Sequence, residues 1–405
     1  MVRPMLALII LLLLLSLPGV ALGQVQITDQ VTHKFGEFIE FRGQIQEDAP
    51  VQSLQLFIQP EHQTDTISSP PLIPEAGSVE YQIDPNQEKI RAFSTLEYWF
   101  EVTMDNGDLI ATPRQTYSYD DNRFTWENRS EEPIDVYWHD GDASFGQAIL
   151  DVAQQGLEQI NSLLPMPSLD KVRIYAYANA VDLRATLQIS NKNWVGAHTD
   201  PDLGVMVVSL PPGPEQRLEM ERQIPHELMH IMLYKKIGPA YTNLPIWLNE
   251  GLASIAELYP NPDYLVLLND AYENDSLPPI SSLCTSFPRD AAGAYLAYAQ
   301  SASFTRFLQQ QYGSSGLDSL LLAYADGLDC ERGIQIALGS DLTQLELRWR
   351  RETFGQNPWF TALTNLAPWL VLMAAVLVVP VIIVAGSLRR KATSQQPIDS
   401  RVQAK

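Results

Sequence analysis

Two histidines stand four residues apart in the segment IPHELMHIML, residues 224–233, and a glutamate follows the first of them. On a helix, His226 and His230 lie one turn apart on the same face, so both imidazoles can bind one cation. Glu227 points away from that cation but stays near the place where a water molecule beside it would lie. This spacing is typical of a zinc site with a general base that is not a ligand.

A third ligand is expected from the segment LPIWLNEGLASIAELYP, which contains Glu250 twenty residues after His230. Two histidines and one glutamate leave a fourth tetrahedral position for water, as catalytic zinc sites do. The alternative is that Glu250 is an ordinary surface residue of a helix. The three residues together favour a catalytic zinc site over a helix that carries polar residues by chance.

Two helices have to position these ligands. We expect the first to carry Pro225 in its first turn and to end at Gly238. The second is expected to begin at Leu244-Pro245 and to end at Pro260. The hairpin that they form would bring Glu250 to the histidines.

The surrounding segments predict an α+β domain at 121–365. Residues 133–139, 171–177 and 204–210 have strand patterns, and 144–164 has apolar residues at helical spacing. From 291 to about 353 the chain is predicted to be helical throughout. A small sheet followed by a mainly helical half therefore frames the candidate zinc site.

HELMH together with WLNEGLA resembles the gluzincin metallopeptidases, and most closely the peptidase MA-like domains and their aminopeptidase relatives, whose second motif reads W-x-N-E-G-x-A. The gap between HELMH and the ligand glutamate matches the thermolysin spacing. The resemblance covers about 130–355. It implies one Zn²⁺ per chain held by His226, His230 and Glu250, with Glu227 as the general base for hydrolysis of a peptide or protein substrate.

The resemblance extends to YAQSASFTRFLQQQYG, residues 298–313, which is similar to an aminopeptidase segment that begins Y-E-K-G. It implies that Tyr298 stabilises the tetrahedral intermediate. Two alternatives stay open: Tyr298 as a core residue of an Ala-rich helix, and Tyr295 on a nearby face in the same role.

The sequence departs from this family in two places. The aminopeptidases have a G-x-M-E-N strand whose glutamate binds the substrate's amine, and the corresponding NWVGAHTDPDLGVMVVSL has no such glutamate. Thermolysin-type enzymes orient a ligand histidine with an aspartate where this chain has Ser254, although Glu257 is another candidate for that role. His198 is a candidate substrate contact, and the strand at 205–210 is predicted to pair with an extended substrate.

These departures keep a second function in view. The chain could be a non-catalytic, membrane-anchored binding or sensor protein on a gluzincin scaffold. In favour of an enzyme, the three ligands and the base are all present.

Residues 24–120 are predicted to form an all-β sandwich of the immunoglobulin or fibronectin type. Short segments with partly alternating apolar residues follow one another, and Asn106-Gly107 is typical of a hairpin turn. This region contains no catalytic constellation, so we interpret it as a spacer or recognition module.

The two ends predict membrane insertion. Residues 1–23 have the pattern of a cleaved signal peptide, with an uncleaved anchor as the alternative. Residues 366–386 are long and apolar enough for one transmembrane helix, and the tail at 387–405 is basic, which places it in the cytoplasm. The protein is thus expected in the cell membrane with residues 24–365 outside. Its net charge of −21 argues against a nucleic-acid partner.

The chain has two cysteines, Cys284 and Cys330, both in the part expected outside the cell. A pair in an oxidising compartment predicts one intrachain disulfide. The alternative is two buried free thiols.

The predicted topology can be tested with a tag at Lys405. Protease added to intact cells should digest residues 24–365 and spare the tag, because the positive tail is expected to stay inside. A tag that is digested from outside would contradict this orientation.

Overall fold

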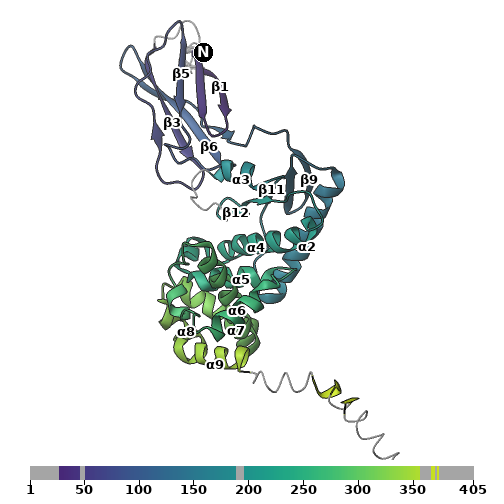
Figure 1. Cartoon of the computed structure of the whole chain (residues 1–405). Coiled ribbons are helices and arrows are strands. Elements are labelled where there is room, and N and C mark those ends of the chain that lie inside the picture. Colours follow the sequence, from purple (N-terminus) through teal and green to yellow (C-terminus); the bar gives the residue numbers. More distant parts are fainter. Residues whose placement is uncertain (1–26, 46–50, 188–195, 356–365, 370–371, 374–405) are drawn as a thin grey trace, which may run out of the picture.

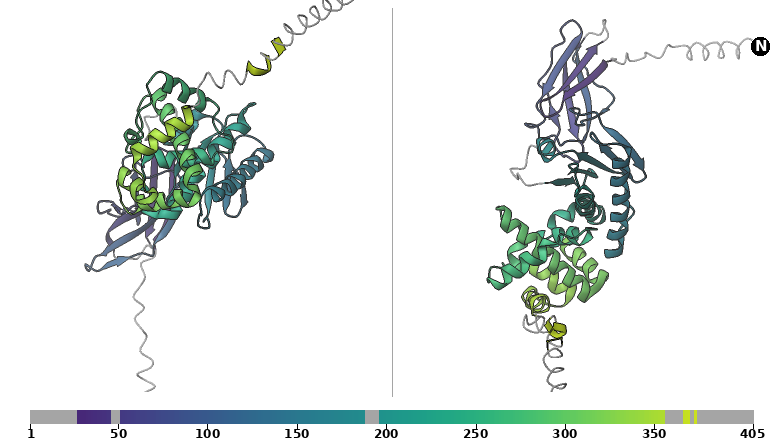
Figure 2. Two further views of the ribbon diagram at one scale, coloured as in Figure 1. Left: turned by 90° about the horizontal axis from the view of Figure 1, so that it is seen from below. Right: turned by 45° about the vertical axis from the view of Figure 1, so that its right-hand side comes forward.

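The computed structural model describes residues 27–45, 51–187, 196–355, 366–369 and 372–373. The described chain is elongated, with a β-rich region at one end, a second sheet in the middle and a group of helices at the other end (Figure 1). Turned by 45° about the vertical axis, the three parts keep this order (Figure 2, right). The N-terminal half is therefore sheet-rich, and the C-terminal half is mainly helical.

The N-terminal strands form two antiparallel sheets. One contains β1 (Ile27–Lys34), β2 (Phe38–Ile45) and β5 (Ser78–Ile83), and the other contains β3 (Val51–Pro60), β4 (Ile67–Ser68), β6 (Thr95–Met104), β7 (Leu109–Ala111) and β8 (Gln115–Ser118). Alternate residues of β3 and β6 are buried, as expected for strands with one face on a core. Ile39 and Phe41 from one sheet and Leu56 and Phe100 from the other belong to one buried cluster.

This arrangement confirms an all-β N-terminal region, whereas its kinship with immunoglobulin or fibronectin domains stays a prediction. The hairpin predicted at Asn106-Gly107 is present between β6 and β7. Gly107 adopts a φ of 87°, which side-chain-bearing residues rarely take.

The central sheet has the strand order β12-β13-β11-β10-β9. Its members are β9 (Glu127–Glu131), β10 (Ile134–Trp138), β11 (Val172–Tyr177), β12 (Ala197–Asp200) and β13 (Val205–Ser209). The three inner strands are parallel, and both outer strands run antiparallel to their neighbours. Helix α2 (Ala143–Leu163) connects β10 to β11, and α3 (Ala180–Leu187) follows β11.

The prediction that the strand at 205–210 lies at an edge and pairs with substrate is wrong. β13 lies between β12 and β11, and all five of its residues are buried. A continuous apolar run such as VMVVS is typical of an inner parallel strand, covered on both faces. Among the described residues, the edge on this side is β12, whose sequence AHTD is short and polar.

The helical half contains α4 (Gln216–Ile237), η1 (Gly238–Asn243), α5 (Ile246–Ala256), α6 (Asp263–Glu273), η2 (Ile280–Leu283), α7 (Ala291–Ala325), α8 (Cys330–Leu338) and α9 (Leu342–Phe354). Gly238 ends α4 as predicted. The predicted start is wrong, because α4 begins nine residues earlier than Pro225 and encloses it. Helix α5 starts after Pro245 as predicted but ends at Ala256, ahead of Pro260.

The face of the central sheet that α2 and α4 do not cover carries aromatic side chains and meets the N-terminal region. The ring of Phe93, from the segment between β5 and β6, stacks on Tyr175 of β11 with centroids 3.7 Å apart. Beside it, Arg91 donates two hydrogen bonds of 2.7 Å each to the carboxylate of Asp202. These contacts fix the β-rich region against the segment that joins β12 to β13.

Within the residues that the structure describes, no helix is both long and apolar enough to span a membrane. The predicted signal peptide, most of the predicted transmembrane helix and the basic tail lie outside those residues.

The predicted disulfide between Cys284 and Cys330 is confirmed. The carbonyl of Cys284 accepts a 3.0 Å hydrogen bond from the amide of Ile246, and the indole of Trp247 donates to Cys330 Sγ at 3.3 Å. Both bonds reach the first turn of α5. The disulfide therefore anchors the start of the helix that carries Glu250.

Replacing both cysteines by serine should lower the free energy of unfolding by about 3–4 kcal/mol, because the bond closes a loop across 46 residues. Urea denaturation of the full chain without reductant measures this loss. Wild-type protein in dithiothreitol is the matched control and should lose a similar amount. Equal stability of the oxidised wild type and the double variant would contradict the prediction.

Candidate metal centre

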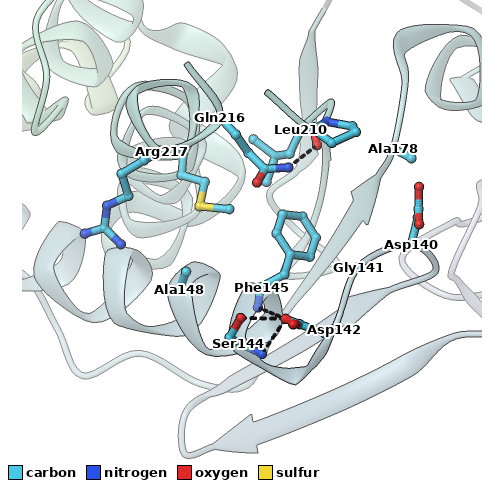
Figure 3. A pocket seen from close by; sticks show the side chains of 12 residues that line it. Asp140, Gly141, Asp142, Ser144, Phe145, Ala148, Ala178, Leu210, Gln216 and Arg217 are labelled. Atoms are coloured by element: carbon cyan, nitrogen blue, oxygen red, sulfur yellow. Dashed lines mark hydrogen bonds between the residues drawn. The ribbon is translucent and has the colours of Figure 1, made fainter. Parts of the chain in front are cut away.

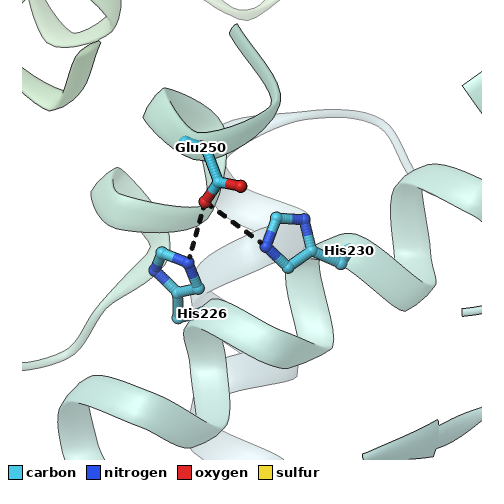
Figure 4. Close-up of side chains that lie close together, drawn as sticks. All are labelled: His226, His230 and Glu250. Carbon is cyan, nitrogen blue, oxygen red and sulfur yellow. Dashed lines mark ion pairs between the residues drawn. The ribbon is translucent and has the colours of Figure 1, made fainter. Parts of the chain in front are cut away.

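Three potential ligand atoms converge where α4 faces α5 (Figure 4). Glu250 Oε2 lies 3.3 Å from His226 Nε2 and 3.7 Å from His230 Nε2, and the three ligand atoms all lie within 4.8 Å of one another. Ligands about 2.1 Å from a tetrahedral cation lie about 3.4 Å apart. The donor set and its spacing therefore fit Zn²⁺.

The second nitrogen of each imidazole has its own partner. His226 Nδ1 lies 3.1 Å from Glu257 Oε1, and His230 Nδ1 lies 3.1 Å from both Asn249 Oδ1 and the hydroxyl of Tyr241. Such partners hold a histidine ligand in one orientation and leave Nε2 directed at the metal.

Of the two orienting residues considered from the sequence, the structure brings Glu257 to His226. Ser254 is buried, and its hydroxyl has no hydrogen-bond partner in the described part of the chain. Sequence reasoning missed Asn249 and Tyr241. Asn249 is adjacent to the ligand Glu250, and this neighbourhood was the available signal. Tyr241 lies in the short helix η1 after α4, and no motif marked it.

The carboxylates give this site a field that favours positive charge. Burial lowers the pKa of His226, but hydrogen bonds to Glu250 and Glu257 outweigh burial and hold this pKa well above its ordinary value. Burial raises the pKa of Glu257, and its bond to His226 offsets this only in part. Cations suit such a field, since buried carboxylates need a positive partner.

Pro225 explains how α4 and α5 are held together. A proline inside a helix has no amide hydrogen, so the carbonyl of Glu221, one turn earlier, has no partner within the helix. That carbonyl accepts a 2.9 Å hydrogen bond from the amide of Leu258, directly after Glu257. The proline thus fastens the end of α5 to α4 next to His226.

Gly251 explains how α5 approaches α7. A Cβ atom at this position would lie 2.1 Å from Thr305 Oγ1 and 2.7 Å from the carbonyl oxygen of Ser301, both on α7. Only glycine permits this close contact. The glycine that follows Glu250 in the motif therefore sets the depth at which α5 is buried, and with it the position of the ligand.

Glu227 lies beside the three ligand atoms and is not one of them. Its carboxylate is buried and accepts a 2.5 Å hydrogen bond from the hydroxyl of Thr199 on β12. A cavity of about 620 Å³ is lined by Glu227, by Thr199 and by the three candidate ligands. The edge strand and the base therefore share one wall of the candidate active site.

Tyr298 and Tyr295 both line this cavity but differ in their surroundings. Tyr298 packs near His226, with ring centroids 6.3 Å apart. Tyr295 is more exposed, and its hydroxyl accepts a hydrogen bond from Asn261. Tyr298 is therefore the better placed of the two. His198 also lines the cavity.

A second cavity, of about 490 Å³, lies where α2 begins and does not reach the histidines. Asp142 accepts hydrogen bonds there from the amides of Ser144 and Phe145 (Figure 3). These bonds cap the first turn of α2, as an N-terminal aspartate commonly does. They have a structural role, so this cavity does not compete with the metal centre.

A family model described as Peptidase MA superfamily matches residues 152–355, half of the chain. The chain belongs to the Peptidase MA superfamily. The matched range contains all three candidate ligands, Glu227 and Tyr298, and it confirms the resemblance on which the zinc assignment was based. The Peptidase MA domain thus begins within α2 and includes β11, β12, β13 and the helical half.

Other similarities are distant. One solved structure, titled "Myokine structure", is 11% identical, covers 24% of this chain and 94% of its own, and has a TM-score of 0.20. An aminopeptidase N family protein from Idiomarina loihiensis is 9% identical, with 82% of this chain and 74% of its own covered and a TM-score of 0.36. No protein with a curated description matches the sequence.

The purified full chain should contain about one zinc per molecule by elemental analysis, and His226→Ala or Glu250→Ala should abolish this content, because each removes one of three protein ligands. Glu257→Gln should instead weaken zinc binding by roughly 10–100-fold, as losing an orienting partner does. Glu273→Gln on the exposed end of α6 is the matched control. Stoichiometric zinc in both alanine variants would exclude this site.

Proposed function

We propose that this protein is a zinc-dependent peptidase, anchored in the cell membrane by residues 366–386, with its Peptidase MA domain outside the cytoplasm. The observation that carries this proposal is the position of Glu227, buried next to three convergent ligand atoms and facing the edge strand β12. A purely structural zinc site has four protein ligands, no open coordination position and no need of a neighbouring base.

His226, His230 and Glu250 would hold the metal. Zinc in this site supplies a Lewis acid that polarises a carbonyl and lowers the pKa of water.

Glu227 is proposed as the general base. Its carboxylate takes a proton from water as the water oxygen bonds to the peptide carbonyl carbon, and it then gives that proton to the nitrogen when the C–N bond breaks. The hydroxyl of Thr199 donates to one carboxylate oxygen and leaves the other free for the proton. This contact holds the base in one orientation.

Tyr298 is proposed as a donor to the oxyanion that forms on the carbonyl oxygen. Burial, Glu250 and Glu227 raise its pKa above the ordinary value, so the hydroxyl stays protonated at neutral pH and can donate a hydrogen bond.

The substrate is proposed to bind as an added strand on β12. The amide of Ser209 donates to the carbonyl of Gly196 at 2.8 Å, which fixes the alternation of paired and unpaired positions along β12. By that alternation, the backbone groups of Ala197 and Thr199 point to the open edge. An extended peptide can pair with them beside Glu227.

Glu227→Gln should keep its zinc and its fold, because residue 227 is not a ligand in this geometry. Its hydrolysis rate should fall by about 10²–10⁴-fold, the usual effect of losing a general base. Peptide cleavage and elemental analysis on the same sample measure both. Glu215→Gln, at the exposed start of α4, is the matched control and should cleave at the wild-type rate.

If Glu227→Gln cleaved as fast as wild type with zinc bound, any activity would belong elsewhere, and the chain would fit a non-catalytic binding or sensor protein.

Tyr298→Phe should lower the rate by about 10²–10³-fold, the typical effect of removing one oxyanion donor. Tyr295→Phe is the matched variant, because the same atom is removed from the same cavity, and it should have a much smaller effect. A larger loss in Tyr295→Phe would assign the donor role to that residue instead.

A further inference from the structure

A third cavity, of about 290 Å³, lies between the N-terminal β-rich region and the Peptidase MA domain. One side is formed by loops of the N-terminal sheets and the other by the end of α3 and by β12. Its lining includes Phe35, Ile90, Tyr119, Leu187, His198 and Asp200. Both parts of the chain thus contribute to the lining of one cavity.

This cavity and the candidate active site share one lining residue, His198. Successive residues of a strand point to opposite faces. On β12, Thr199 contacts Glu227, whereas Asp200 contacts Arg91 of the N-terminal region at 3.5 Å. His198 therefore lies on the face of β12 that is turned away from the base and toward the N-terminal region.

A peptide added to the open edge of β12 continues this alternation. Directly opposite residues on paired strands place their side chains on the same face of the sheet. A substrate residue opposite Thr199 would face the base, and a residue opposite His198 would face the interdomain cavity. The two positions are one residue apart on the strand, about 3.3 Å.

The walls of the cavity are mainly apolar. Phe35 and Tyr119 stack with centroids 5.1 Å apart, and they and Ile90 are almost fully buried. The positive charge nearby is neutralised, since Arg91 pairs with Asp202 at 2.7 Å and also with Asp200. A space of this composition suits an uncharged, apolar group.

We propose that this interdomain cavity receives an aliphatic or aromatic side chain of the peptide substrate, so that the N-terminal region helps to select the cleavage site. The inference rests on the proposed peptidase function and on substrate pairing with β12. The N-terminal region, which the sequence predicts to be a spacer or a recognition module, then acts as a recognition module. The Arg91–Asp202 pair holds it in register with the edge strand.

The test uses the full-length protein and a peptide library in which one position at a time is varied. Wild type should prefer large apolar residues at one position near the cleaved bond. Leu187→Ala and His198→Ala change two different elements that line the cavity, α3 and β12, and each should lower the ratio of kcat/KM for leucine over alanine at that position by roughly 10-fold. Because His198 is about half exposed, its replacement does not depend on repacking a core.

Leu109→Ala is the matched control, since Leu109 is an exposed leucine on β7 outside the cavity, and it should leave the ratio unchanged. Suppose that hydrolysis depends on Glu227 but both cavity variants keep the wild-type ratio of kcat/KM for leucine over alanine. That result would overturn this inference and leave the proposed peptidase function standing. A loss spread evenly over all substrate positions would overturn it as well. A wild type with no Glu227-dependent hydrolysis would overturn the proposed function and this inference together.

Discussion

One backbone carbonyl connects the parts of the candidate active site. Because Pro225 has no amide hydrogen, the carbonyl of Glu221 is left for the amide of Leu258, and this bond joins the N-terminal part of α4 to the residues directly after α5. Two ligands come from α4 and the third comes from α5. Their spacing, and the approach of Glu257 to His226, therefore depend on how these two helices are fastened. A proline that would ordinarily weaken a helix here supplies the link between two helices.

The remaining elements fix α5 and the base from other sides. Gly251 lets α5 lie against α7, and the Cys284–Cys330 disulfide holds its first turn. On the opposite side of the site, Thr199 of β12 holds Glu227. Arg91 from the N-terminal region pairs with Asp202, which lies in the turn between β12 and β13. The ligands, the base and the edge strand thus belong to one packed unit that extends into the β-rich region.

Local signals made much of this site predictable from the sequence. The spacing of His226 and His230 fixes their shared helix face, and Gly238 ends that helix. The alternation of buried residues in β3 and β6 was equally local, whereas the disulfide followed from a pair of cysteines in an oxidising compartment. The errors and omissions have a different origin. The start of α4 was placed at Pro225 because proline favours a first turn. The helix instead begins at Gln216, and the Glu221 carbonyl that the proline leaves without a partner in the helix bonds to the amide of Leu258. Tyr241 and Arg91 act through partners that only the folded chain brings near, so no sequence spacing marks them.

The position of the metal is the central claim, and diffraction data collected at the zinc absorption edge test it most directly. Crystals of the full chain grown with equimolar zinc should give one anomalous peak about 2.0–2.2 Å from His226 Nε2, His230 Nε2 and a carboxylate oxygen of Glu250. Glu227 should lie near this peak without binding the metal. A zinc peak at other residues, or no peak in protein that contains zinc by elemental analysis, would contradict it.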